Sequence, residues 1–267
     1  MAIETLPILY QDEMLVAVHK PPGLLVHRSD IDRRETRFAL QLVRDQLGRR
    51  VYPAHRLDKG TSGILLFAFD AQANRHLAGQ FERGEVGKTY LAVVRGWPPE
   101  SGHIDHPLVP DPDGYGLRPG GGEPQSALTD YQRLATIELP DAVDRYPTSR
   151  YALVALYPRT GRRHQLRRHM KHIAHPIIGD ATHGKGRHNR YFQQTFGCGR
   201  LLLACVGLRF RHPGGGAEVE LQAGPGAQFV ELLDRFGWNQ AWQGASSCAG
   251  PKEPTGESKA ILKSDHG

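Results

Sequence analysis

The segment 55–63, which reads HRLDKGTSG, holds the densest set of reactive side chains in the sequence. Its carboxylate, Asp58, lies between two cations, Arg56 and Lys59. A carboxylate close to fixed positive charge stays ionised at neutral pH, so Asp58 could act as a nucleophile or as a base. The alternative is a structural Asp that caps a turn and pairs with Arg56. The residue types alone leave both interpretations open.

A run of basic residues between Arg159 and Lys171 contains no acidic residue. The spacing of its apolar residues predicts a helix over 162–174. Backbone N–H groups at a helix N-terminus and neighbouring guanidinium groups bind phosphates together. The run therefore predicts a phosphate-binding surface, and a solvated basic face is the alternative. Its candidate binding residues are Arg163, Arg167, Arg168 and Lys171.

Histidines at 169, 172 and 175 raise the hypothesis of a zinc site, because neutral imidazole is a common zinc ligand. The third lies about 240° around a helix from the first, so the three do not share one face. Neither a Cys nor a carboxylate is well placed beside them. The glycines at 114–122 lack the Lys-Ser/Thr of a phosphate-binding loop. We therefore expect neither a metal nor a cofactor.

Tyr90 lies in the middle of a strand-like segment, KTYLAVVR, at 88–95. A tyrosine in a strand is most often a packing residue. Beside a reactive carboxylate it could instead stack on a nucleobase or transfer a proton. Spacing alone does not decide between these roles.

The reactive segments lie between expected strands and helices. Because the strands outnumber the helices interspersed among them, the sequence favours an α+β domain with a mostly antiparallel sheet. The loop with Asp58 precedes a buried strand, and the basic run follows another. Expected strands are 6–10, 14–19, 64–69, 88–95, 151–157, 201–210 and 218–222. Expected helices are 36–47, 71–83 with Asp70 as its cap, 162–174 and 228–236.

We expect one domain over 1–243, since 267 residues can form one large core without disulfides or metals. Gly, Pro and Asp crowd the segment 98–147, which has only short strand-like pieces near 128–134, and we interpret it as a long surface excursion rather than a separate domain. The tail 244–267 has little to bury and is expected to be disordered.

The net charge of +6 comes from 34 Lys and Arg against 28 Asp and Glu, and it is unevenly placed. Seven of the cations lie at 150–175 without one acidic residue, so the rest of the chain is nearly neutral. This distribution predicts an anionic partner at that segment. The longest apolar run, 201–208, is too short to span a membrane. No signal peptide is recognisable, and three cysteines suggest a reducing cytosol.

Four motifs in order make the sequence resemble the RluA-type pseudouridine synthases: HRLDKGTSG (55–63), GKTYLAVVRG (87–96), TGRRHQLRRH (160–169) and HPIIGD (175–180). The resemblance covers about residues 5–240. It implies a largely antiparallel mixed sheet, flanked by helices around a central catalytic cleft. It also implies cofactor-free isomerisation of uridine to pseudouridine in RNA.

The segments 8–29, 145–184 and 236–238 are most similar to the subgroup that modifies uridine 65 of tRNA. This similarity makes tRNA the expected partner. Ribosomal RNA or another tRNA uridine is the alternative substrate. A non-catalytic RNA-binding protein and a zinc-dependent hydrolase are the alternative classes, and a monomer is the expected state.

The resemblance also implies roles for residues at matching positions. Asp58 would be the catalytic aspartate, and Tyr90 would lie against the target base. Arg162 would form a salt bridge with Asp58. Arg56 would help to extrude the base and take its place in the RNA. The remaining basic residues of the run would hold phosphates.

Overall fold

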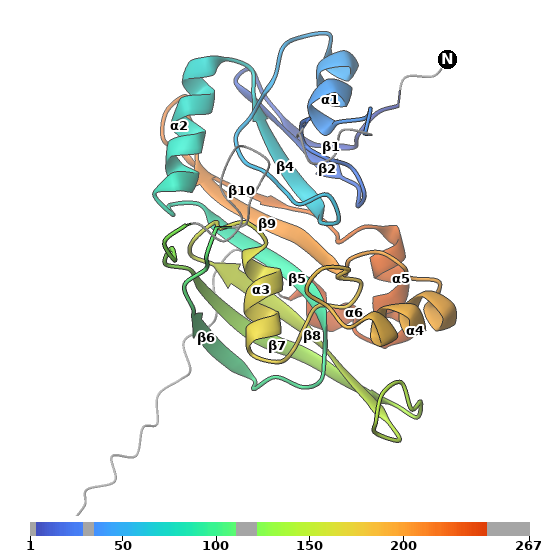
Figure 1. Ribbon diagram of the computed structural model, residues 1–267. Helices are drawn as coiled ribbons and strands as arrows, with labels where there is room; N and C mark the ends of the chain where they lie inside the picture. The colour runs from blue at the N-terminus through green and yellow to red at the C-terminus, as the bar shows by residue number, and fades with distance from the viewer. Residues whose placement is uncertain (1–3, 29–34, 111–121, 245–267) are drawn as a thin grey trace, which may run out of the picture.

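The computed structural model describes residues 4–28, 35–110 and 122–244, and within these ranges ten strands form one sheet. Eight strands follow the order β1-β2-β4-β9-β5-β8-β7-β6, while β3 pairs with β4 and β10 with β9 (Figure 1). The pairings are antiparallel except for β4 with β9. The strands are β1 (Ile8–Gln11), β2 (Leu15–Lys20), β3 (Tyr52–Pro53), β4 (Ser62–Ala68), β5 (Gly87–Arg95), β6 (Ser101–Asp105), β7 (Leu128–Leu139), β8 (Ser149–Pro158), β9 (Leu203–Arg211) and β10 (Glu218–Gln222).

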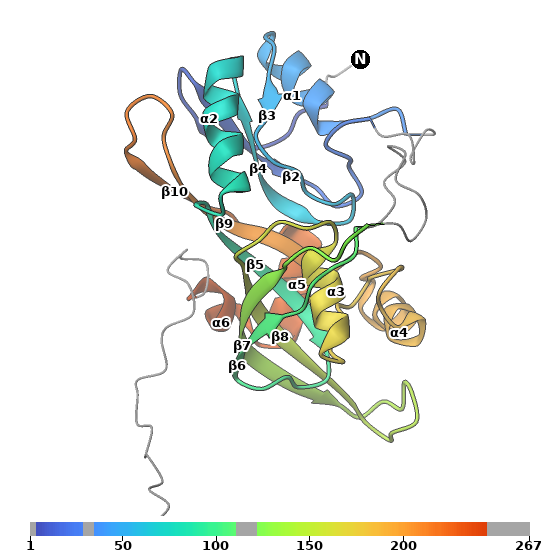
Figure 2. The same ribbon diagram turned by 60° about the vertical axis from the view of Figure 1, so that its left-hand side comes forward.

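Helices cover this sheet in two groups (Figure 2). In both views α1 and α2 accompany β2 and β4 at one end of the molecule, and α3 to α6 lie around β5 and β8. This arrangement confirms the predicted α+β class with a largely antiparallel sheet. The helices are α1 (Ala39–Leu47), α2 (Ala71–Glu82), α3 (Gln165–His172), α4 (Gly186–Phe196), α5 (Ala227–Arg235) and α6 (Asn239–Gln243). Among the described residues, no helix has both the length and the apolar character needed to cross a membrane.

Alternation along β5 explains how one strand can support helices on both faces. Leu91 and Val93 pack into a core cluster that includes residues of α4 and α5. Ala92 and Val94 pack into a separate cluster with Leu166 of α3. Because successive side chains of a strand point to opposite faces, the apolar run of β5 is buried on both sides.

The segment 98–147, expected to be a surface excursion, contributes two strands to the sheet. β7 pairs with β8 along almost its whole length, and β6 pairs with β7 at the edge. The first part of β7 is buried or half-buried, and exposed side chains alternate with half-buried ones only over 136–139, where one face of the strand meets solvent. Residues 111–121 of this segment, and 245–267 of the expected disordered tail, lie outside the described residues.

The ends of helices follow local capping rules. Asp70 accepts hydrogen bonds from the N–H groups of Gln72 and Ala73, both at 2.8 Å, which confirms the predicted cap of α2. The helix expected over 162–174 is shorter and begins at Gln165. His164, just before it, has a left-handed backbone with φ of 53°. The residues that precede it therefore form a turn, which places α3 opposite the loop that carries Asp58.

Candidate active site

Asp58 lies in the loop between β3 and β4, with 28% of its side chain exposed. The Thr61 N–H donates to the Asp58 carbonyl oxygen at 3.0 Å, which closes a turn. At Gly63, where φ is 109°, a Cβ would lie 2.0 Å from the Cys205 carbonyl oxygen. Only glycine allows β4 to approach β9 so closely, and this contact fixes the point where the loop joins the sheet.

Lys20 supports the same loop from inside the protein, where it is completely buried. Its Nζ donates to the carbonyl oxygens of Pro21, Leu24 and Lys59 at 2.9, 2.7 and 3.2 Å. The last of these belongs to the residue after Asp58. Burial lowers the pKa of Lys20 to about 7, although the charge of Asp58 acts in the opposite direction.

Replacing Lys20 by Met should lower the free energy of unfolding by about 2–4 kcal/mol, because buried carbonyls lose their donor. The wild-type protein should also gain stability as the pH rises from about 7 to 10.5. Over that range the unfolded lysine keeps its proton while the folded lysine has lost it. The variant should lack this gain. Chemical denaturation at neutral and at alkaline pH measures both effects, and equal pH slopes for the two proteins would contradict the lowered pKa.

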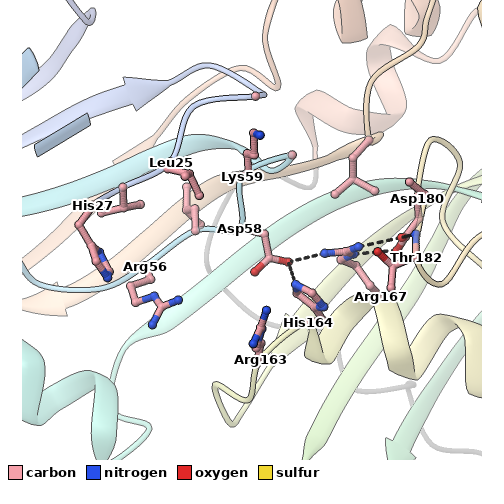
Figure 3. Close-up of a pocket in the computed structure, with 16 residues that line it drawn as sticks. Leu25, His27, Arg56, Asp58, Lys59, Arg163, His164, Arg167, Asp180 and Thr182 are labelled. Atoms are coloured by element: carbon pink, nitrogen blue, oxygen red, sulfur yellow. Dashed lines mark hydrogen bonds and ion pairs between the residues drawn. The ribbon is translucent and has the colours of Figure 1, made fainter. Parts of the chain in front are cut away.

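A buried arginine joins Asp58 to a second carboxylate (Figure 3). Arg167 Nη1 donates to Asp58 Oδ2 at 3.2 Å, while its Nε and Nη2 donate to the two oxygens of Asp180 at 2.7 and 2.8 Å. The Asp180 side chain is fully buried. Burial raises its pKa, but Arg167 and the backbone N–H groups of Thr182 and His183 together outweigh that effect and keep the pKa below its usual value. The bidentate pair therefore holds the guanidinium in one orientation, with one nitrogen directed at Asp58.

This geometry corrects the role implied for Arg162. Its Nε donates to the Ser126 carbonyl oxygen at 3.1 Å, and the ion pair with Asp58 is made by Arg167. The reason is the start of α3, because only residues after His164 lie on a helical face. Arg167 was also expected to bind RNA, but only 10% of its side chain is exposed and its guanidinium contacts two carboxylates. It is a buried partner of Asp58 and not a surface phosphate ligand.

Asp58 lies where two cavities of about 450 and 750 Å³ adjoin. The smaller extends toward Asp180, and the larger toward Tyr90. Their shared lining comes from both sides of the cleft: His27, Arg56, Leu57, Asp58, Arg163, His164 and Arg167. Together the cavities place a carboxylate at the centre of a cationic cleft.

Tyr90 shares the larger cavity with Asp58, so the structure brings these two predicted residues together. It lies in β5 opposite Cys205 of β9. Burial raises the pKa of the Tyr90 hydroxyl well above its usual value, and Cys205 and Asp58 act in the same direction. The side chain therefore presents a neutral hydroxyl and an aromatic ring to the cleft.

The other predicted binding residues occupy different places. Arg56 is exposed and Arg163 is half-buried, and both line the two cavities. Arg168 donates from Nη1 to the Val109 carbonyl oxygen at 2.8 Å. Lys171 is exposed farther along α3. The predicted basic surface is therefore divided between the cleft and the helix beyond it.

Two histidines in the cleft were not singled out from the sequence as candidates for the site. His164 Nε2 lies 4.0 Å from Asp58 Oδ2, and burial lowers the pKa of His164. His27 Nδ1 is buried without a hydrogen-bond partner among the described residues. The position of His164 within the basic run was the one available signal. In the same described ranges, no group of three or more His, Cys, Asp or Glu side chains could hold a metal ion.

The cleft thus brings together an ion-paired carboxylate and a tyrosine, as the resemblance to an RNA-modifying enzyme family implies. The family model for RNA pseudouridylate synthase matches residues 14–172, and the chain belongs to that family. The predicted resemblance is thereby confirmed. The chain is 47% identical over 238 residues to tRNA pseudouridine synthase C of Vibrio cholerae, covering 88% of this chain and 98% of that protein.

Two further comparisons agree with this assignment. The protein of the same name from Yersinia pestis is 49% identical over 236 residues, which cover 88% of this chain and 92% of the relative. Among solved structures, human RNA pseudouridylate synthase domain containing 4 aligns with a TM-score of 0.64 and 26% identity. That alignment covers 86% of this chain and 92% of the human chain.

Proposed function

We propose that the protein isomerises a uridine of tRNA to pseudouridine, and that the target is uridine 65. The observation that carries the proposal is the placement of Asp58 at the junction of two cavities, with Arg167 and Tyr90 beside it. The names of the similar proteins support tRNA as the substrate. The choice of uridine 65 rests on the sequence segments that resemble that subgroup.

The reaction rearranges one nucleotide without adding or removing atoms overall. The bond from N1 to C1′ breaks, the uracil rotates, a bond forms from C5 to C1′, and C5 loses a proton while N1 gains one. The rearrangement is therefore balanced within the nucleotide and needs no external oxidant or reductant. Asp58 acts as the reacting carboxylate, either by covalent attack or by abstraction of a ribose proton, and both routes require its ionised form.

The target base must leave its stack to reach Asp58, at a cost of a few kcal/mol. Arg56 lines both cavities and is exposed, so it can fill the space that the base leaves in the RNA. The Tyr90 ring then lies against the extruded base inside the larger cavity. Arg167 does not need to move, because Asp180 already fixes it.

Tritium release from tRNA labelled at C5 of uridine tests the proposed reaction, because bond formation at C5 expels that atom. The protein should release tritium, and mapping should place the product at position 65. A protein that only binds RNA would release none, which would overturn the proposal. Pseudouridine found in ribosomal RNA or at another tRNA position would support the proposed reaction but would show that the assigned substrate is wrong.

Replacing the exposed Lys171 by Ala should weaken tRNA binding and reduce the salt dependence of that binding by about one unit of slope. The loss should be similar for any RNA sequence, since a phosphate contact carries no base information. Filter binding over a range of salt concentrations measures both quantities. Arg44→Ala in α1, where the side chain is 53% exposed, is the matched control. If Lys171→Ala and Arg44→Ala had the same affinity and the same salt slope, Lys171 of α3 would not contact the RNA.

A further inference from the structure

A separate cavity of about 750 Å³ lies beyond the C-terminal end of α3. It is bounded by the β7–β8 turn and by the first residues of α4, and its lining shares no residue with the cavities around Asp58. In both views the β7–β8 turn projects from the sheet at the end opposite α1 and α2 (Figures 1 and 2). The cavity is thus a distinct feature of the surface.

A buried polar chain orients one arginine of this cavity. Arg95 Nε donates to His188 Nε2 at 3.1 Å, and the other ring nitrogen of His188 lies 2.8 Å from the Tyr151 hydroxyl. Burial, with the charge of Arg95, lowers the pKa of His188 to about 4. The imidazole is therefore neutral and accepts from Arg95, so its Nδ1 carries the proton and donates to Tyr151. Arg95 Nη2 lies 3.8 Å from Asp144, which is too far for a hydrogen bond.

Two exposed aromatic rings form a wall of the same cavity: Trp97 is 37% exposed and Tyr146 is 52% exposed. Trp97 is fixed, because its Nε1 donates to two backbone carbonyl oxygens at 3.1 and 3.2 Å. The Arg150 guanidinium lies 4.5 Å from the Trp97 ring centre, and that of Arg145 lies 4.7 Å from the Tyr146 ring centre. Aromatic rings interleaved with guanidinium groups are the surface on which single-stranded nucleic acids stack their bases.

The charges near the cavity also favour an anionic ligand. Asp144 is matched by Arg187, whose Nη1 lies 3.2 Å away, in addition to Arg95. Glu138 is matched by Arg150 at 3.2 Å. These two carboxylates are therefore matched by guanidinium groups, and Asp141 in the same turn accepts from the Tyr191 hydroxyl at 2.7 Å. Among the residues that line the cavity, Arg95 and Arg150 outnumber the single acid, Asp144.

We propose that this cavity binds an unpaired nucleotide of the RNA substrate, outside the reaction cleft. The base packs against Tyr146 and Trp97, and the phosphate binds Arg95. The inference rests on the proposed function for the identity of the ligand and extends its binding surface. One RNA can reach both places along α3, because Arg167 in its first turn contacts Asp58 and His175, just beyond its end, lines the cavity.

Changing Tyr146 to Ala should raise the dissociation constant for tRNA by roughly tenfold, the effect of removing one stacked base contact. Changing Tyr146 to Phe should restore wild-type affinity, since the ring is kept. The single-turnover rate at saturating tRNA should be the same in all three proteins, because Asp58 and Arg167 are untouched. Tyr146 is half exposed, so neither substitution should affect folding.

Changing Arg95 to Gln retains a donor for His188 but removes the charge, and it should reduce the salt slope of tRNA binding by about one unit. Arg44→Ala should change neither quantity. Wild-type affinity of Tyr146→Ala, together with an unchanged salt slope of Arg95→Gln, would overturn the proposal. If the wild-type protein formed no pseudouridine but Tyr146→Ala still lost affinity for tRNA, this binding site would stand and the proposed reaction would be rejected. The two proposals can therefore fail separately.

Discussion

Changing Asp58 to Asn is expected to abolish pseudouridine formation while tRNA binding is kept. Asn has nearly the volume of Asp, and its amide oxygen can still accept the bond that Arg167 Nη1 makes at 3.2 Å. The negative charge is lost, and with it the nucleophile or base. Turnover should fall by a factor on the order of 10⁴ or more. Tritium release in single turnover at saturating tRNA measures the loss, and filter binding measures the affinity.

Asp70→Asn is a suitable control, because Asn caps a helix about as well as Asp. That variant should retain both turnover and stability, since Asp70 caps α2 outside the cavity linings around Asp58. Normal turnover by Asp58→Asn would show that another group performs the reaction. Loss of tRNA binding together with turnover would instead indicate that Asp58 shapes the RNA-binding surface.

The sequence predicted the central strands of the fold because they are continuous apolar runs. β4, β5 and β8 are buried on both faces. A short continuous apolar run of this kind is typical of a strand at the centre of a sheet. α4 was not predicted, since it buries only His188 and Phe192 and its sequence is largely polar. β6 was missed in a segment rich in Gly and Pro, and β7 was recognised only as short strand-like pieces near 128–134. Their pairing with β8 depends on contacts that local composition does not encode.

The candidate site was predicted where its residues form a compact motif and missed where they meet through space. Asp58 and Tyr90 stand out within short segments, and the structure places them in one cavity. The partner of Asp58 depends on where α3 begins, and a shift of that start turns Arg167 rather than Arg162 toward it. Asp180 ends the HPIIGD motif and Lys20 lies in the segment 8–29, but neither segment shows that the charge is buried, because Arg167 and the Lys59 carbonyl oxygen come from elsewhere in the chain.

Asp180 is a positioning residue in this arrangement. It does not line the cavity that holds Tyr90, and its contact with the site runs through Arg167. Its Oδ1 also accepts from the N–H groups of Thr182 and His183, both at 2.9 Å. The carboxylate is therefore anchored to the backbone and transmits that rigidity to the guanidinium. If Asp180 lost its charge, the Arg167 guanidinium would be free to rotate toward Asp58, and the position of the reacting oxygen would change.

Changing Asp180 to Asn should lower turnover by about 100-fold, because small displacements of reacting groups have large effects on rate. The free energy of unfolding should fall by about 3 kcal/mol, as expected when a buried ion pair loses one charge. Asp130→Asn is the matched control: Asp130 is buried and pairs with Arg159 at 2.6 Å, but it does not line the cavities around Asp58. Single-turnover rates are compared at a temperature where both variants are fully folded. Equal rates at that temperature would show that Asp180 supports only the stability of the fold, whereas a selective loss in Asp180→Asn identifies it as the residue that aligns Arg167 with Asp58.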